Sequence, residues 1–292
     1  MEKLFTKGGR LMNLCDLRAI QDLLERHGFR FSKSMGQNFL IDESIPQDIA
    51  ASSRADKTCG VLEIGPGIGP LTAQLAQRAG KVVSIELDKT LLPVLQETMA
   101  DYENVEIVSA DVMKLDLDAL IREKFEGLTP IVCANLPYNI TTPVMTKLME
   151  TAALQSITVL VQKEAAKRLT SVTKDVGPLY WELQYRMETE YLFDVPADRF
   201  YPQPKVTSAV MRCVRRTKPA VEVEDEKFFL KVIHGAFLLR RKTLVNSLSS
   251  AFSKLDKAAI AAAIEHCGLP PTVRGEALAL NDFAALAKAL KG

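Results

Sequence analysis

The sequence predicts an α/β protein with a mostly parallel sheet, followed by a smaller domain built only from helices. Between residues 60 and 162, short runs rich in β-branched residues alternate with amphipathic segments of helical length. Runs of this kind are typical of parallel strands that are buried on both faces. After Pro219 and an acidic linker, hydrophobic residues recur only with helical spacing. The boundary between the two domains is predicted near residue 216, giving domains of residues 1–216 and 217–292.

The N-terminal part, residues 1–58, precedes the predicted sheet. Leucines and an isoleucine with helical spacing predict a first helix that starts from Asn13 as N-cap and ends before Gly28. A basic loop follows over residues 30–40, and it leads into a second helix near Asp42.

The sheet itself is predicted over residues 59–216. The first five strands are predicted at 61–64, 82–85, 105–108, 131–134 and 157–161, and the helices between them at 71–78, 90–99, 117–124 and 142–150. A helix through Leu169 and two further strands, at 183–191 and 206–214, extend the sheet. The C-terminal domain is predicted to contain helices at 228–239, 244–252, 258–266 and 283–290.

Composition and charge exclude several classes of protein. With 292 residues, 47% hydrophobic and 25% charged, the chain is an ordinary globular protein with a net charge of +1. Affinity for nucleic acid must therefore come from local clusters of cations. The sequence contains no apolar stretch of membrane-spanning length, and its N-terminus lacks the apolar core of a signal peptide. We expect a cytoplasmic protein.

The cysteines and histidines do not predict a metal site. The five cysteines are far apart, no two form a Cys-x-x-Cys pair, and there are only three histidines. We expect reduced thiols that pack as small hydrophobic side chains.

Polar residues and glycines follow the first three predicted strands, where ligands gather in parallel sheets. Gly65 and Gly67 lie in a glycine turn that allows close approach of a ligand and leads into a helix N-terminus. Glu86 follows the second strand, at an offset typical of an acid that binds ribose hydroxyls. Asp111 follows the third, where it can accept a hydrogen bond from an adenine amino group. A nicotinamide enzyme would share the first two features.

The fourth strand ends in Asn135-Leu136-Pro137-Tyr138, which a nicotinamide enzyme does not need. An Asn side-chain oxygen and the Leu136 carbonyl can accept both hydrogens of an adenine amine. Pro137 restricts the backbone so that this carbonyl can point inward. Tyr138 can stack on the base, and Phe39, Phe200 or Tyr201 can close over its other face.

Taken together, these motifs resemble the ribosomal RNA adenine N6,N6-dimethyltransferases. The matching segments are 34–40 (SMGQNFL), 62–69 (LEIGPGIG), 135–138 (NLPY), 161–164 (VQKE), 200–210 (FYPQPKVTSAV) and 240–244 (RRKTL). The resemblance implies a Rossmann-like class I methyltransferase sheet with a smaller C-terminal all-α domain that binds RNA or the ribosome.

The resemblance also implies S-adenosylmethionine as methyl donor and an activity on small-subunit ribosomal RNA. The residues expected to bind the cofactor are Asn38, Leu40, Gly65, Gly67, Glu86, Leu87, Asp111, Val112 and Asn135. The expected reaction adds two methyl groups to each of two adjacent adenosines in a hairpin near the 3′ end of that RNA. We expect a monomer that acts on the immature 30S particle.

Cation clusters provide the expected contacts with RNA. The residues selected for this role are Arg30, Lys33, Arg240, Arg241 and Lys242, together with the aromatic Phe200. Two alternatives remain open from the sequence. One is a 23S ribosomal RNA adenine methyltransferase of the macrolide-resistance type, and the other is a non-catalytic RNA-binding assembly factor; a DNA adenine methyltransferase is a weaker third.

Overall fold

The strands and helices follow the alternation predicted from the sequence. The computed structural model describes residues 12–31, 36–173 and 175–291. The strands are β1 (Phe39–Leu40), β2 (Cys59–Ile64), β3 (Lys81–Glu86), β4 (Val105–Ser109), β5 (Thr129–Asn135), β6 (Ser156–Gln162), β7 (Met187–Val195), β8 (Phe200–Tyr201) and β9 (Ser208–Arg215). The five parallel strands predicted first are thus confirmed, with each extended by one to three residues.

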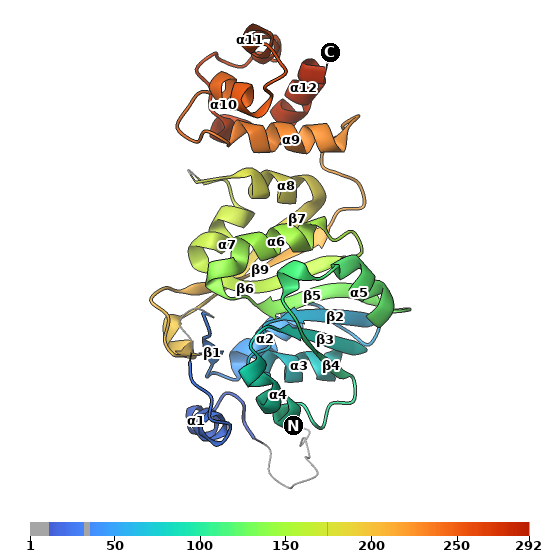
Figure 1. The fold of residues 1–292 in the computed structure, drawn as a ribbon, viewed down its shortest axis with the longest axis vertical. Coiled ribbons are helices and arrows are strands. Elements are labelled where there is room, and N and C mark those ends of the chain that lie inside the picture. Colours follow the sequence, from blue (N-terminus) through green and yellow to red (C-terminus); the bar gives the residue numbers. More distant parts are fainter. Residues whose placement is uncertain (1–11, 32–35, 174, 292) are drawn as a thin grey trace. The chain divides into compact units, whose positions relative to one another are not determined.

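The main sheet has seven strands in the order β4-β3-β2-β5-β6-β9-β7 (Figure 1). The pairs β2–β3, β3–β4, β2–β5 and β5–β6 are parallel, whereas β9 runs antiparallel to β6. The chain therefore proceeds outward from β2 to β4 and then returns to the other side of β2 to form β5. A crevice forms outside the carboxyl ends of the strands where the order reverses in this way.

Helices flank the strands on both faces of the sheet (Figure 1). Along the chain up to residue 186, the helices are α1 (Leu17–Arg26), α2 (Ser44–Ser52), α3 (Pro70–Arg78), α4 (Leu92–Thr98), α5 (Leu117–Lys124), α6 (Thr141–Glu150), α7 (Lys163–Thr170) and α8 (Pro178–Arg186). The first helix starts later than predicted, because the Asp16 side chain, not that of Asn13, caps it by accepting from the Ala19 N–H.

One predicted strand begins in the wrong place. Residues 183–186 belong to helix α8, and β7 starts only at Met187. Gly177 and Pro178 start the helix, since proline is well suited to a first helical position. Six of the nine α8 residues are buried, so its sequence lacks the polar face by which a helix is recognised.

The hydrophobic core beneath one face of the sheet joins strands to α2 and α3. Val61, Val82 and Ile131 from three neighbouring strands pack with Ile49 of α2 and Leu75 of α3, and each is at most 4% exposed. All six residues of β2 are buried. A central strand without a solvent face explains why β2 is apolar apart from Glu63.

The chain divides into two compact units. The first comprises Met1–Ala166 and Glu190–Val214, and the second comprises Lys167–Thr189 and Arg215–Gly292. The second unit therefore includes α8 in addition to the C-terminal helices. The predicted domain boundaries at 216 and 217 stay a prediction, and the sequence contained no signal that residues 167–189 would join the helical unit.

The helical unit has a hydrophobic core of its own. Its C-terminal helices are α9 (Glu226–Ala236), α10 (Leu244–Ala251), α11 (Lys257–His266) and α12 (Leu280–Lys291), which confirms the four predicted there. Phe229 of α9 and Phe283 of α12 are fully buried, and Trp181 of α8 packs its ring against Phe283. The aromatic side chain of α8 thereby supplies part of this core.

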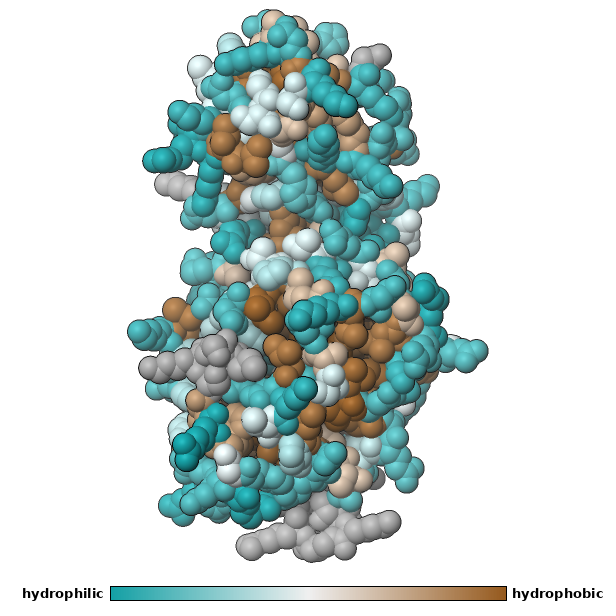
Figure 2. Space-filling model, in the orientation of Figure 1, coloured by the Kyte–Doolittle hydropathy of each residue, from teal (hydrophilic) through white to brown (hydrophobic). Residues whose placement is uncertain are grey.

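Surface features agree with the ordinary composition. Figure 2 shows a face on which hydrophilic residues predominate and hydrophobic residues gather in separate patches. Among the described helices, none is long and apolar enough to cross a membrane. The five cysteines are free thiols, and burial raises the pKa of Cys213 to about 12.

A glycine in β2 provides a test of the sheet packing. A Cβ on Gly60 would lie 2.4 Å from Cγ of Phe125, which is 4% exposed. We expect Gly60→Ala to lower the free energy of unfolding by about 2 kcal/mol, because overpacking forces buried groups apart. The measurement is urea denaturation followed by circular dichroism.

Gly177→Ala is the matched control, since a Cβ there has no neighbour within 4 Å. We expect this control to change the free energy of unfolding by less than about 0.5 kcal/mol. Equal urea midpoints for the two variants would show that the Phe125 ring moves aside without loss of stability.

Candidate active site

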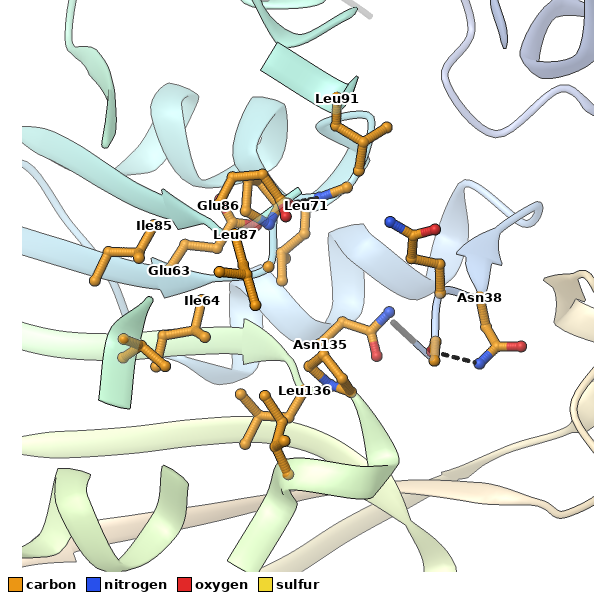
Figure 3. Close-up of a pocket in the computed structure, with 18 of the residues that line it drawn as sticks. Asn38, Glu63, Ile64, Leu71, Ile85, Glu86, Leu87, Leu91, Asn135 and Leu136 are labelled. Atoms are coloured by element: carbon orange, nitrogen blue, oxygen red, sulfur yellow. Dashed lines mark hydrogen bonds between the residues drawn. The ribbon is translucent and has the colours of Figure 1, made fainter. Parts of the chain in front are cut away.

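A cavity opens where the carboxyl ends of β2, β3, β4 and β5 meet the β1 segment (Figure 3). The predicted cofactor-binding and catalytic residues all line it: Asn38, Leu40, Gly65, Gly67, Glu86, Leu87, Asp111, Val112, Asn135, Leu136, Pro137 and Tyr138. The structure therefore brings together residues from four strand ends and from the segment before β2.

The glycine turn after β2 depends on a backbone that only glycine adopts readily. Gly65 and Gly67 have φ angles of 68° and 62°, in the left-handed region. A Cβ on Gly67 would lie 3.1 Å from the Phe39 ring. The absence of side chains lets the turn pass close beneath Phe39, and α3 begins directly after it at Pro70.

Glu86 is a buried carboxylate at the end of β3. Its Oε1 accepts from the Asp88 N–H at 2.8 Å and its Oε2 accepts from the Gly67 N–H at 3.4 Å. Burial raises the pKa of Glu86, while these backbone donors oppose the rise. The carboxylate is thus held in one orientation, and it borders the cavity with acceptor capacity for hydroxyl donors.

Gln37 is a cavity residue that the sequence reasoning missed. Its Nε2 donates to Asp88 Oδ2 at 2.7 Å, across 51 residues of chain. Its Oε1 is buried, and it has no hydrogen-bond partner among the described residues. A buried acceptor without a partner is costly, so a ligand that donates to it would stabilise this arrangement.

Asp111 lies at the end of β4 with its side chain partly exposed. Its Oδ1 accepts from the Met113 N–H at 2.9 Å, and Lys114 Nζ lies 3.8 Å from Oδ2. The backbone bond orients the carboxylate at the cavity wall, so that Oδ2 remains an acceptor for a donor within the cavity.

The segment after β5 places an amide, a carbonyl and a ring at one side of the cavity. Figure 3 shows the Asn135 amide directed toward the segment that carries Asn38. The Leu136 N–H donates to the Leu160 carbonyl at 3.1 Å, which ties this residue to β6, and Pro137 has a φ of −57°. The Tyr138 hydroxyl lies 2.5 Å from Ser208 Oγ. Burial raises the pKa of Tyr138, so its hydroxyl stays protonated.

Of the aromatic residues predicted to cover the base, Phe39 lines the cavity. Phe200 is 2% exposed within the sheet core, and it does not line the cavity. The core encloses the Phe200 ring, and its contact with RNA stays a prediction. Tyr201 packs against Phe31 with ring centroids 5.5 Å apart, so it supports the aromatic cluster beside Phe39.

Glu63 is a second residue missed from the sequence, because it lies inside β2 and not at its end. Its Oε2 accepts from Thr72 Oγ1 at 2.7 Å and from Ser84 Oγ at 2.6 Å. The side chain is 1% exposed at the cavity floor, and burial raises its pKa to about 7. A charged residue in an otherwise apolar strand run was the signal that could have found it.

None of the predicted RNA-binding cations that the structure describes is among the residues that line the cavity. Arg30 is exposed on the loop that follows α1, and Lys33 lies outside the described residues. Arg240, Arg241 and Lys242 are exposed between α9 and α10 of the second unit. Arg240 pairs with Asp175 of the same unit.

Comparisons with known proteins agree with this geometry. The model of the family described as ribosomal RNA adenine dimethylase matches residues 28–290. The chain is 46% identical to "Ribosomal RNA small subunit methyltransferase A" of Streptococcus sanguinis strain SK36, over 96% of this chain and 99% of the relative. It is also 46% identical to the protein of the same name from Lactococcus lactis strain IL1403, over 92% and 93% of the two chains.

Two solved structures share the fold. The 23S rRNA methyltransferase ErmE is 26% identical with a TM-score of 0.66, covering 87% of this chain and all of that one. A dimethyladenosine transferase from Plasmodium falciparum is 22% identical with a TM-score of 0.69, covering 85% and 95% of the two chains. These likenesses confirm the predicted α/β methyltransferase sheet followed by helices.

The buried Glu63 predicts a pH dependence of stability. Because its pKa is raised from 4.5 to about 7, the folded chain binds this proton more tightly than the unfolded chain. The contribution of Glu63 to the free energy of unfolding is fully present below the pKa that the residue has in the unfolded chain. This contribution is lost as the pH rises through about 7. Glu63→Gln keeps the side-chain shape and removes the titration.

We expect the stability of Glu63→Gln relative to the wild type to increase between about pH 5 and pH 8. Urea denaturation of both proteins at each pH measures this difference and cancels the titration of all other groups. A difference that does not vary with pH would contradict the raised pKa.

Proposed function

The chain belongs to the ribosomal RNA adenine dimethylase family, and on this premise we propose that it dimethylates N6 of two adjacent adenosines in a hairpin near the 3′ end of small-subunit rRNA. The observation that carries the proposal is the single cavity bounded both by Gly65 and Glu86 and by the Asn135–Tyr138 segment. Acceptors suited to a nucleoside cofactor and to an adenine amine thus face the same space.

The relatives favour small-subunit over large-subunit RNA as substrate. Identity is 46% with proteins named as small-subunit methyltransferases, but only 26% with a 23S rRNA methyltransferase. The intact set of cavity acceptors supports an enzyme over a non-catalytic assembly factor, which would have no need to keep Glu86, Asp111 and Asn135 together.

The cavity residues fit S-adenosylmethionine, which supplies an electrophilic methyl group on a sulfonium centre. Glu86 offers carboxylate oxygens to the ribose hydroxyls, and Asp111 offers one to the adenine amino group. The half-exposed Leu87 provides an apolar surface beside Glu86 for the adenine ring. Gly65, Gly67, Asn38, Leu40 and Val112 complete the proposed wall, and the unpartnered Gln37 Oε1 supplies a further acceptor.

The Asn135–Tyr138 segment positions the target adenine. The Asn135 side-chain oxygen and the Leu136 carbonyl accept the two amine hydrogens, which directs the nitrogen lone pair toward the methyl donor. Tyr138 stacks on the base after the nucleotide leaves its helix. The methylated amine retains one hydrogen, so the second transfer proceeds with one fewer hydrogen bond.

The cation clusters supply the remaining proposed contacts. We assign Arg30, Lys33, Arg240, Arg241 and Lys242 to RNA phosphates, and we infer that the protein acts as a cytoplasmic monomer on the immature small subunit. These cations oppose phosphate charge without reading sequence, so position along the RNA is set by the shape of the particle.

Primer extension across the 3′ region of small-subunit rRNA tests the proposed function. The substrate is small subunits from cells that lack this dimethylation, incubated with cofactor in the presence or absence of the protein. We expect new stops at two adjacent adenosines, since two methyl groups on N6 block base pairing. Full read-through after incubation with protein would refute the proposed reaction.

Asn135→Ala tests the proposed positioning of the amine. Loss of one acceptor leaves the nitrogen poorly aligned, so we expect the rate of methyl transfer to fall about a hundredfold. Cofactor affinity should change much less, because Glu86 and Asp111 are untouched. Near-normal turnover would remove Asn135 from this role.

Two variants of Tyr138 separate stacking from hydrogen bonding. Tyr138→Phe keeps the ring and loses the bond with Ser208, so activity should be largely retained. Tyr138→Ala removes the ring, and we expect a loss of turnover. Equal losses in the two variants would assign the role to the hydroxyl.

A further inference from the structure

The turn between α9 and α10 exposes two leucines directly before three cations. Leu238 is 57% exposed and Leu239 is 37% exposed. Arg240, Arg241 and Lys242 follow, and all three are exposed. We call residues 238–242 the leucine–cation turn.

The backbone of this turn is fixed by a buried side chain. Ser247 of α10 is fully buried, and its Oγ accepts from the Leu239 N–H at 2.9 Å and donates to the Gly235 carbonyl at 2.7 Å. The Lys242 N–H donates to the Leu239 carbonyl at 2.8 Å. The leucines are therefore presented on an ordered turn, which lowers the entropy lost when a partner binds.

The two leucines do not pack into the hydrophobic core of the helical unit. The preceding Phe237 turns inward, packs against that core and approaches Phe283. Leu238 and Leu239 are absent from the hydrophobic residues that pack there among the described residues. One exposed leucine needs no explanation, but an adjacent pair beside three cations forms a combined apolar and basic surface.

The charge of the turn favours a polyanion as partner. Arg240 pairs with Asp175, but their side chains are 63% and 74% exposed, so the pair is weak and can be exchanged for phosphate. Arg241 and Lys242 form no ion pair within the part of the chain that the structure describes. A strand of RNA offers phosphates to the cations and base edges or sugars to the leucines.

We propose that Leu238 and Leu239 contact ribosomal RNA directly, packing on its sugars and base edges while Arg241 and Lys242 contact the phosphates. This inference rests on the proposed function only for the identity of the RNA. It adds an apolar contact to the cation contacts assigned above, and the two kinds of contact respond differently to salt.

Binding of wild-type and variant proteins to undermethylated small subunits tests the inference. We expect Leu238→Ser with Leu239→Ser to weaken binding about tenfold at every potassium chloride concentration, since the lost apolar burial does not depend on salt. Arg241→Gln should reduce the slope of log affinity against log salt by about 1. Leu17→Ser is the matched control, because Leu17 is 36% exposed in the first unit.

Hydroxyl-radical probing of rRNA in the saturated complexes identifies the partner. Loss of a discrete set of sugar protections in the double-leucine variant, retained by Leu17→Ser, supports direct RNA contact. Wild-type affinity for the double-leucine variant would overturn the inference. Weakened binding with every rRNA protection retained would also overturn it, because the leucines would then contact a ribosomal protein.

Failure of the proposed function produces a different result. If the wild-type protein binds small subunits and the double-leucine variant alone loses protections, the RNA contact stands even where primer extension detects no methylation. If methylation occurs and the variants bind alike, the proposed function stands and the leucine contact does not.

Discussion

The reversal of strand order between β2 and β5 is the constraint on which the site depends. Because β3 and β4 lie on one side of β2 and β5 lies on the other, the connections leave the centre of the sheet in opposite directions. The crevice between them is bounded by Gly65, Glu86 and Asn135, each at a strand end. Gly65, Glu86 and Asn135 are far apart in the sequence, so the sheet is what brings the Glu86 carboxylate and the Asn135 amide to the wall of one cavity.

Buried carboxylates order the wall of this crevice, and their desolvation lowers the stability of the fold. Glu63 and Glu86 lie on adjacent strands, and burial raises the pKa of each. Two side-chain hydroxyl groups donate hydrogen bonds to Glu63, whereas backbone N–H groups donate to Glu86. Desolvation of these carboxylates lowers the stability of the folded chain. In return, their oxygens are acceptors that need no reorganisation when a ligand binds, a relation between stability and preorganisation that is common at functional sites.

The helical unit has a closed aromatic core and an exposed leucine–cation turn. Phe229 and Phe283 fill the interior, while Ser247 holds the leucine–cation turn at the surface. Rigid presentation and weak internal pairing of the cations suit a large RNA partner.

Sequence by itself determined the strand positions and most of the cavity. Strand runs and the residues that end them, such as Gly65, Glu86 and Asn135, are contiguous patterns whose meaning depends only on local chain geometry. Tertiary structure decided the rest: Gln37 meets Asp88 across 51 residues, Glu63 becomes a buried acid, and Phe200 turns into the core. It also decided that residues 178–186 form a helix, because burial around most of α8 removes the periodicity that identifies one. Contacts between distant segments and the burial they create exist only after the sheet has formed, and no local pattern encodes them.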